Sequence, residues 1–367
     1  HENLERLKHS EAIQLFVDRA RNSKPGFQLD QQNGSIISQI CRQLDGIPLA
    51  IEMAAARIRH MNSKMILERI NDRFQILSSD RRTSISRQKT LRATLDWSYD
   101  LLSDREKLLF ARLSVFASDF SAENAEEICS DDQMDKEDVL DILSNLVDKS
   151  MLAIRSLQQG SLRYGMLETL KEYAAEKLSE TGEKEVLNRR HYDFLLFKLD
   201  QAFEERVEHG TIWADRIEAD HDEYLKAVDW ARKEPALFLK ICGGLGWFWE
   251  GRAYGLAMQK LKEAIDGYQD KSAYRARALM AYGWVVIRYT DFAEEATACF
   301  EEALSIWIAL GNKMETGHLH YNFGMSKAMG NEQETAMLHF QEAYSIFNSL
   351  GDPKSLAMAK YGLGFGY

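Results

Sequence analysis

The sequence has few residues that interrupt helices or form cross-links. Only four prolines and four cysteines occur among its 367 residues. So few helix breakers, in a chain rich in alanine, leucine and glutamate, predict a mainly α-helical protein. The cysteines are far apart and form no CxxC pair, which favours a reducing, cytoplasmic compartment. We find no signal peptide and no apolar run of about 18 residues, so no membrane span is expected.

The sequence also lacks the motifs of common catalytic and metal sites. It contains no GxxxxGK(S/T) phosphate loop, no HExxH, no GxSxG and no Cys/His cluster with metal-ligand spacing. Residues 129–132 (CSDD) resemble the end of a Walker B strand, but a predicted helix precedes them instead of an apolar strand. We therefore assign no catalytic residue and no metal ligand, and we do not expect this chain to hydrolyse ATP.

Positive charge is scarce beyond the first hundred residues. The formal net charge is −11. Residues 1–100 hold 16 Lys and Arg against 12 Asp and Glu, whereas the rest hold 30 against 45. An acidic surface repels phosphate backbones, so the larger part of the chain should bind nucleic acid poorly. One dense basic run reads as a solvated linker, with a phosphate or acidic-partner contact as the alternative. It comprises Arg81, Arg82, Arg87, Lys89 and Arg92.

Residues 1–80 are predicted to form a set of short amphipathic helices, and a tight corner joins two of them. Gly46 suits the left-handed position after one helix, and Pro48 suits the first turn of the next. The unpaired amides of that next helix are a natural seat for an anion, although a plain helix–helix turn needs the same residues. The predicted helices span residues 10–21, 35–44, 48–60 and 63–71.

Residues 81–183 contain the only convincing β pattern, and we interpret them as a winged helix. Ser103 and Glu106 fit a capping box at the start of its first helix. Three helices followed by a hairpin and a closing helix are typical of that fold. The predicted helices span 107–116, 122–129, 136–147 and 167–178, and the predicted strands span 151–155 and 162–166 with a turn at 159–160.

The helix predicted over residues 136–147 is the one that would enter a DNA groove. It carries Glu137, Asp138 and Asp141, against only Lys136 at its start. Proteins that read a groove need Lys and Arg to neutralise phosphates. DNA binding by this domain is therefore not expected.

Residues 251–367 repeat with offsets of 39 and then 40 residues. Two small alanines flank one large apolar residue in each unit, a pattern that lets paired helices stack into an α-solenoid. Residues 184–250 look helical but diverged. The three matching sets are Ala257, Leu261 and Ala264; Ala296, Phe300 and Ala303; and Ala336, Phe340 and Ala343.

Two side-chain groups in the helical region are candidates for a ligand site. Trp247, Phe248 and Trp249 form an aromatic cluster, which we assign to core packing, with an exposed ligand platform as the alternative. His318 and His320 point away from each other on a helix, so we interpret them as repeat-surface residues instead of a metal pair.

Several long motifs, in this order, resemble the lid, winged-helix and post-wing part of bacterial STAND ATPases, the NB-ARC relatives found in LuxR- and SARP-type regulators. The A-x3-F-x2-A pattern resembles the second helix of a tetratricopeptide repeat, although its period exceeds the usual one of about 34 residues. The motifs are residues 11–16 (EAIQLF), 44–50 (LDGIPLA), 90–99 (TLRATLDWSY), 146–150 (LVDKS) and 166–174 (MLETLKEYA).

The resemblance implies an adenine-nucleotide contact at Gly46, Pro48 and Leu49, because the family's proline packs beside the base. The family's MHD motif aligns with residues 166–168 (MLE), so its phosphate-sensing His is replaced by Leu167, which cannot donate a hydrogen bond to phosphate. Glu168 is kept as a weaker candidate, with a simple strand-to-helix junction as the alternative. ATP or ADP is implied for the intact protein, whereas this fragment alone is not expected to bind either tightly.

The sequence therefore predicts the regulatory part of a nucleotide-dependent signalling ATPase whose intact form is a slow ATPase. The implied partners are an upstream P-loop core in the same protein, an inducer or protein ligand on the solenoid, and further copies of the chain. Both ends look cut from something longer. The alternative is a non-switching adaptor whose solenoid holds a protein partner, and direct DNA binding is a third possibility.

Overall fold

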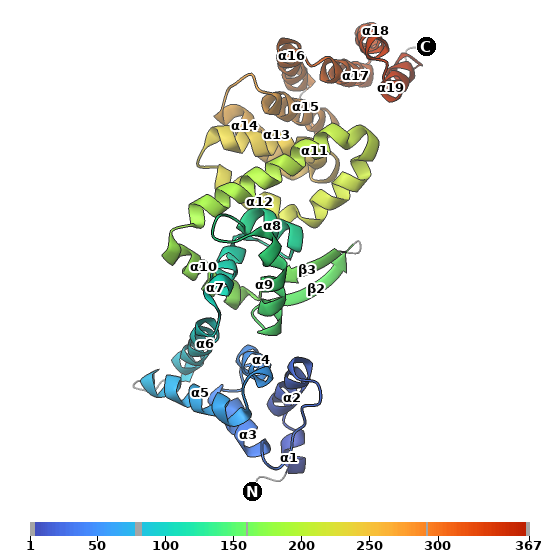
Figure 1. The fold of residues 1–367 in the computed structure, drawn as a ribbon. Helices are drawn as coiled ribbons and strands as arrows, with labels where there is room; N and C mark the ends of the chain where they lie inside the picture. Colours follow the sequence, from blue (N-terminus) through green and yellow to red (C-terminus); the bar gives the residue numbers. More distant parts are fainter. Residues whose placement is uncertain (1–3, 78–82, 159–160, 291–292, 365–367) are drawn as a thin grey trace. The chain divides into compact units, whose positions relative to one another are not determined.

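A computed structural model describes residues 4–77, 83–158, 161–290 and 293–364 (Figure 1). The chain divides into two compact units, His1–Leu187 and Asn188–Tyr367. Helices dominate both units and one small antiparallel sheet lies in the first, so the mainly α prediction is confirmed. Within the described residues, no helix is both long and apolar enough to cross a membrane.

The first unit begins with a bundle of short helices. Helix α4 is buried almost all round, at Ala50, Ile51 and residues 53–56, because it lies inside the bundle. Helix α2 turns Ile13, Phe16, Val17 and Ala20 inward at helical spacing. The elements are α1 (Leu4–Lys8), α2 (Glu11–Ser23), α3 (Gly34–Gln43), α4 (Pro48–Ala56), the 3-10 turn η1 (Arg57–Arg59) and α5 (Ser63–Leu77).

Helix α6 (Thr83–Asp100) is a helix that the apolar pattern does not predict. It packs against α4 and α5, and Trp97 joins their hydrophobic core. The side chain of Arg92, from the basic run, is bound to Glu176 at 2.5 and 2.6 Å. Arg92 is thus paired within the chain, while its side chain is 45% exposed. Arg81 and Arg82 lie outside the described residues, and so does the side chain of Arg87.

A winged helix follows α6. The predicted capping box is confirmed, because the Glu106 amide donates to the Ser103 hydroxyl at 3.3 Å and the Ser103 amide donates to the Glu106 carboxylate at 2.7 Å. The helix that it starts ends at Arg112, earlier than predicted. The elements are α7 (Asp104–Arg112), η2 (Leu113–Val115), β1 (Phe120–Ser121), α8 (Ala122–Cys129), α9 (Lys136–Asp148), β2 (Ala153–Gln158), β3 (Ser161–Gly165) and α10 (Glu168–Thr181).

The sheet has three strands instead of the predicted two, in the order β1-β3-β2. The added strand, β1, is two residues long and pairs Phe120 with Tyr164. Across the hairpin Ile154 pairs with Tyr164, and the register shifts between Ile154 and Ser156. The turn predicted at 159–160 lies outside the described residues.

Arg112 fixes the end of the winged helix. Its guanidinium is 1% exposed and donates to Asp131 at 2.8 and 3.0 Å and to Glu183 at 2.8 and 3.0 Å. A fifth bond runs to the Cys129 carbonyl at 2.7 Å. Asp131, the first of the two aspartates in the CSDD stretch, is thus bound to a buried arginine. Among the described residues, no group of three potential metal ligands is found.

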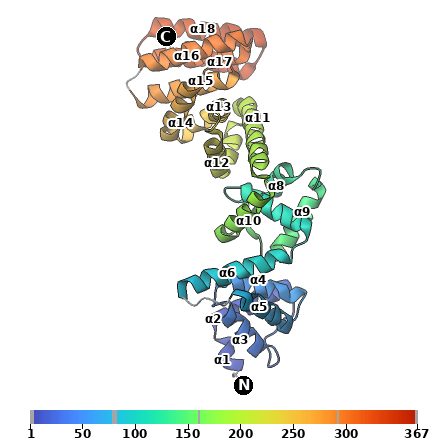
Figure 2. The same ribbon diagram turned by 90° about the vertical axis from the view of Figure 1, so that its left-hand side faces the viewer.

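The second unit is helical throughout (Figure 2). Helix α11 starts in the first unit and has non-helical backbone angles at His209. The elements are α11 (Lys184–Ala219), α12 (His221–Ala231), α13 (Pro235–Arg252), α14 (Tyr254–Gly267), α15 (Ala273–Tyr289), α16 (Ala293–Ala309), α17 (Lys313–Met329), α18 (Gln333–Leu350) and α19 (Pro353–Gly364).

The repeat residues form the centre of this solenoid. The matching alanines and large apolar residues are all at most 1% exposed. The large residues pack against glycines on facing helices: Gly283 of α15 meets Phe300, and Gly324 of α17 meets Phe340. Gly311 and Gly351 follow the corresponding helices α16 and α18 with φ of +68° and +71°, so the repeat also fixes the turns.

For the two candidate ligand sites in this unit, the structure confirms one interpretation and contradicts part of the other. Phe248 and Trp249 are buried, so core packing is confirmed for them. His318 is only 6% exposed and lies against Phe347, so assigning it to the repeat surface was wrong. The face of α17 that His318 occupies is covered by α18. His320 instead meets His339, with their Nδ1 atoms 3.0 Å apart.

Candidate functional site

The corner between α3 and α4 has the geometry that the sequence predicts. Asp45 and Gly46 are both left-handed, with φ of +52° and +68°. The Gly46 amide donates to the Cys41 carbonyl at 3.0 Å and the Asp45 amide to the Arg42 carbonyl at 3.1 Å, which closes α3. Pro48 is the first residue of α4, and no described side chain forms a capping hydrogen bond at its N-cap. The first amides of α4 are therefore available as hydrogen-bond donors.

The outer side of this corner is open. Gly46 and Pro48 are exposed, and Leu49 is half-buried, whereas Ala50 and Ile51 are buried in the bundle. A Cβ added to Gly46 would have no atom within 4 Å. The corner thus presents a proline ring, part of a leucine and the start of a helix to whatever lies outside the bundle.

Helix α6 holds the corner from the other side. The buried Thr90 hydroxyl donates to the Asp45 carboxylate at 2.7 Å, and the Thr94 hydroxyl donates to the Thr90 carbonyl at 2.9 Å. The same helix is bound to α10, because Tyr173 donates to Asp96 at 2.8 Å. A displacement of the winged helix that moves α6 would therefore strain the corner.

Glu168 is the first residue of α10 and is exposed. No hydrogen bond or ion pair between described residues joins it to the corner. Gly46, Pro48 and Leu49 therefore lie at one corner, and no bond within the described part of the chain links Glu168 to it. Nucleotide binding by all four residues stays a prediction.

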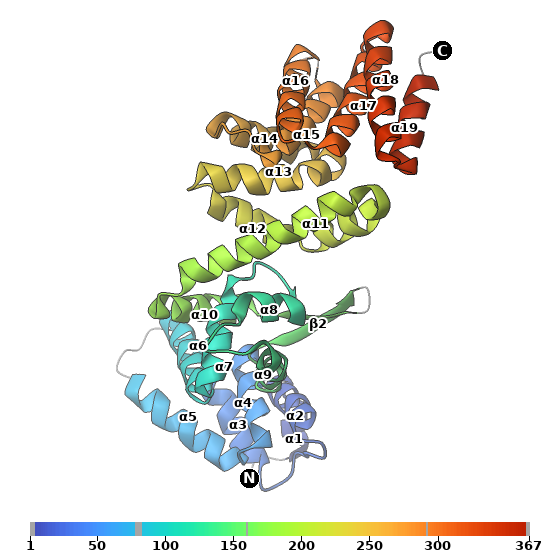
Figure 3. The ribbon, with the colours of Figure 1, turned by 45° about the horizontal axis from the view of Figure 1, so that its top comes forward.

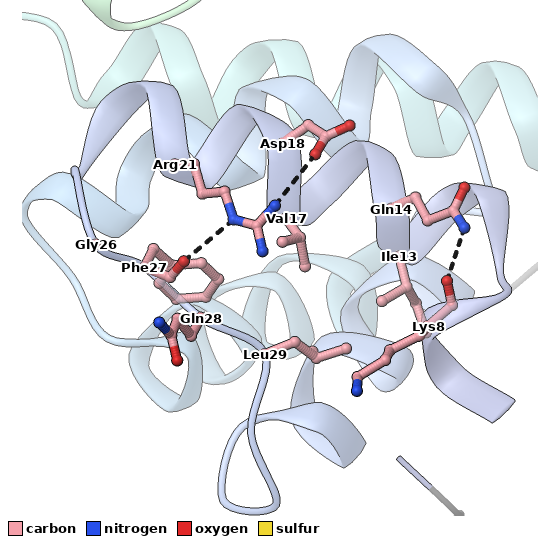
Figure 4. A pocket seen from close by; sticks show the side chains of 10 residues that line it. All are labelled: Lys8, Ile13, Gln14, Val17, Asp18, Arg21, Gly26, Phe27, Gln28 and Leu29. Atoms are coloured by element: carbon pink, nitrogen blue, oxygen red, sulfur yellow. Dashed lines mark hydrogen bonds and ion pairs between the residues drawn. The ribbon is translucent and has the colours of Figure 1, made fainter. Parts of the chain in front are cut away.

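A cavity of about 780 Å³ opens along α2 and the loop that follows it (Figure 4). Its apolar lining is Ile13, Val17, Phe27 and Leu29. Arg21 shapes one end, since its Nε donates to the Phe27 carbonyl at 3.3 Å. The volume lies in the range of small-molecule sites. The bundle thus has an open, partly apolar flank, which the sequence motifs did not locate.

A second cavity, of about 250 Å³, lies between the end of α4 and the end of α9. Arg57 lines it and is 4% exposed. Burial lowers the pKa of the Arg57 guanidinium to about 10, while the charge of Glu106 opposes that shift. Sequence reasoning missed this site because its residues come from segments about 90 positions apart.

The outward surface of α9 is acidic. Glu137 and Asp141 are exposed, Leu140 is 46% exposed, and Lys136 is paired with Glu127 at 2.7 Å. This charge pattern is unsuited to a phosphate backbone.

Comparisons with known proteins agree with this architecture. Residues 102–179 match the family model of a winged helix-turn-helix domain. The chain is 33% identical over 376 residues to "Putative HTH-type transcriptional regulator Rv0890c" of Mycobacterium tuberculosis, covering 97% of this chain and 41% of the relative. The corresponding Mycobacterium bovis protein, Mb0914c, gives the same figures. A second M. tuberculosis protein, "Uncharacterized protein Rv0894", is 37% identical over 183 residues, covering 50% and 46%.

Among solved structures, a STAND protein with a tetratricopeptide repeat sensor from Pyrococcus horikoshii covers 98% of this chain and 57% of its own chain. Its TM-score is 0.39 and its identity is 15%.

The matches define the chain as a protein with a winged-helix domain. It is related along nearly its whole length to the mycobacterial HTH-type proteins, and it spans less than half of their length. The recognition made from the sequence motifs is confirmed at this level.

Proposed function

We propose that this chain is the regulatory part of a nucleotide-gated switch. In this proposal α1–α6 form a lid over an adenine nucleotide that a P-loop core in the same full-length protein holds. The observation that carries the proposal is the corner at Gly46, Pro48 and Leu49, which is rigidly built yet open to the outside. The 780 Å³ cavity on the same bundle adds an open flank where such a core would dock.

The contacts of α6 suggest how the switch would work. Thr90 ties α6 to the corner, and Arg92 and Asp96 tie it to α10. Nucleotide exchange at the corner would change the strain on α6 and hence the position of the winged helix. A ligand bound to the solenoid would shift the same conformational equilibrium. Release of the switch from its closed state would then permit self-assembly and control of transcription.

The name that the relatives carry makes DNA binding a natural question. In our proposal the winged helix is a hinge instead of a DNA reader, because Glu137 and Asp141 face outward on α9. A gel shift at low salt, where weak electrostatic binding is strongest, tests this directly. A tight, sequence-selective shift with the chain would contradict the hinge role.

The second candidate is an adaptor that holds a protein partner without switching. Exposed apolar side chains on the solenoid favour it, including Tyr254 and Tyr289, whose rings stack 4.2 Å apart at 54% and 51% exposure. A gene product with no P-loop before residue 1 would support the adaptor. A P-loop followed by a Walker B strand would support the switch.

The proposed nucleotide contact is tested on the full-length gene product. Nucleotide released on denaturation is quantified by chromatography for the wild type, for Pro48→Ala and for Pro235→Ala. Pro235 is a matched control, since it is also an exposed proline at the start of a helix. Loss of an apolar contact with the base, about 1 kcal/mol, should lower the affinity of Pro48→Ala about fivefold and leave Pro235→Ala unchanged. Equal retention in both variants would contradict the proposal.

The chain by itself gives a second test. Without a phosphate loop it has no group to orient magnesium-bound phosphates. Residues 1–367 should therefore show no turnover with Mg²⁺-ATP, and robust magnesium-dependent hydrolysis would refute this reading.

A further inference from the structure

The 250 Å³ cavity in the first unit lies between the N-terminal helical bundle (α1–α5), here called the lid bundle, and the winged helix. Figures 1 and 3 show the end of α9 next to α4. Arg59 of η1 is hydrogen-bonded to Asp148 of α9 across the cavity wall. The polar residues that line the cavity are Arg57, Arg59, His60, Asn145, Asp148 and Lys149.

Of the Lys and Arg side chains that line this cavity, two are paired with carboxylates of the described residues and one is not. Lys149 is paired with Glu106, at 2.5 and 2.6 Å, and Arg59 with Asp148. Arg57 has no ion pair with any described residue. One of its Nη atoms donates to the Ser98 carbonyl at a long 3.4 Å, and its Nε is buried with no hydrogen-bond partner.

A buried guanidinium without a counter-charge is costly. Removing such a group from water takes several kcal/mol, which only a close anion or a set of good hydrogen bonds offsets. Arg57 lines its cavity with one long hydrogen bond, and Glu106, whose charge acts on it, is already bound by Lys149. The missing element is therefore an anion.

We infer that this cavity binds a small oxyanion of the phosphate class, with Arg57 as its principal ligand. The planar guanidinium fork matches two phosphate oxygens, and Arg59 and Asn145 supply further donors. A volume of about 250 Å³ holds inorganic phosphate or pyrophosphate and is smaller than sites for drug-sized ligands. A bound anion would hold η1 against the end of α9 and so fasten the lid bundle to the winged helix.

The test is titration of the 1–367 chain with inorganic phosphate and with pyrophosphate. Calorimetry is done in chloride buffer at constant ionic strength, so that nonspecific screening stays fixed. We expect one saturable site per chain for at least one of the two anions. The assay contains no nucleotide and no P-loop core, so its failure is distinguishable from failure of the proposed switch.

Two cavity variants locate the site. Arg57→Met should abolish binding, while its stability without phosphate equals or exceeds that of the wild type, because an unpaired buried charge is replaced by an apolar chain. Asn145→Asp is an exposed, isosteric change that adds a negative charge, and it should weaken binding about tenfold or more.

Matched controls make the same chemical changes elsewhere. Arg105→Met removes a surface arginine paired with Asp138, and Asn331→Asp adds a charge in the second unit. Both should bind as the wild type does. The inference is overturned by the absence of saturable binding of either anion up to 10 times physiological phosphate, on the order of tens of millimolar. It is equally overturned by binding that persists in both cavity variants.

Discussion

Replacing Gly324 by alanine should destabilise the solenoid, although alanine is the better helix former. Gly324 lies in α17, and a Cβ there would sit 2.7 Å from two ring carbons of Phe340 and 3.1 Å from the Ala336 carbonyl oxygen. Ordinary contacts begin near 3.4 Å. Helix α18 must therefore move several tenths of an ångström, or the ring must leave its position.

Phe340 has no room to retreat. It is 1% exposed, and its ring also lies so close to Gly362 of α19 that a Cβ there would be 2.5 Å from the ring. Overpacking of this kind costs about 1–3 kcal/mol, whereas the helix-propensity gain of alanine over glycine is at most about 1 kcal/mol. The net expectation is a loss of up to about 2 kcal/mol.

The matched control is Gly255→Ala in α14, where an added Cβ meets nothing within 4 Å. It should be neutral or stabilising by up to about 1 kcal/mol. Urea unfolding of the whole chain followed by circular dichroism gives the stability, and hydrogen exchange of peptides from α17 and α18 localises the change. If Gly324→Ala proves as stable as Gly255→Ala, the interlocking of glycine and phenylalanine does not hold the repeats together.

Three further perturbations test other parts of the structure. Arg112→Met leaves the two partly buried carboxylates of Asp131 and Glu183 without their arginine. It should lower the free energy of unfolding by about 3–5 kcal/mol and speed hydrogen exchange around Glu183. A loss under about 1 kcal/mol would show that Arg112 does not hold this end of the winged helix. Burial raises the pKa of Glu250 to about 7, so the folded state retains a proton that the unfolded chain loses above its ordinary pKa. Stability should then fall as pH rises from about 5 to 8, by about 2 kcal/mol, and Glu250→Gln should remove that slope in pH-dependent melts. Thr90→Val removes the bond to Asp45 and should cost about 1 kcal/mol while speeding exchange in the corner, whereas unchanged exchange there would show that α6 does not hold it.

The parts of the fold that the sequence predicts are those with strong local signals. The capping box, the left-handed Gly46 and the alanine–phenylalanine repeat each depend on residues within a few positions of one another. Such local patterns can be recognised without knowledge of tertiary packing.

Helix α6 and strand β1 were missed for physical reasons. Thr90, Thr94 and Ser98 are buried on α6 beside Ala93 and Trp97, so polar residues interrupt its apolar stripe. Strand β1 is two residues long, which is too short for an alternating pattern, and it forms only because β3 lies beside it.

The candidate site was predictable only in part. The corner residues are contiguous, so a motif can identify them. Arg57 follows an alanine-rich helix and looks like a solvent-exposed end of it, whereas its burial and its cavity depend on Asn145 and Lys149, far away in sequence. His318 was misplaced for a similar reason, since only α18 decides that its face is covered.

We propose that the edge formed by residues 46–49 closes over an adenine ring in the full-length protein. Photolabelling of that protein with an azido-adenine nucleotide, followed by peptide mapping, measures this contact directly. We expect label on the peptide that contains Pro48 and competition by unlabelled ATP or ADP. Specific, competable label found only on other peptides would contradict it.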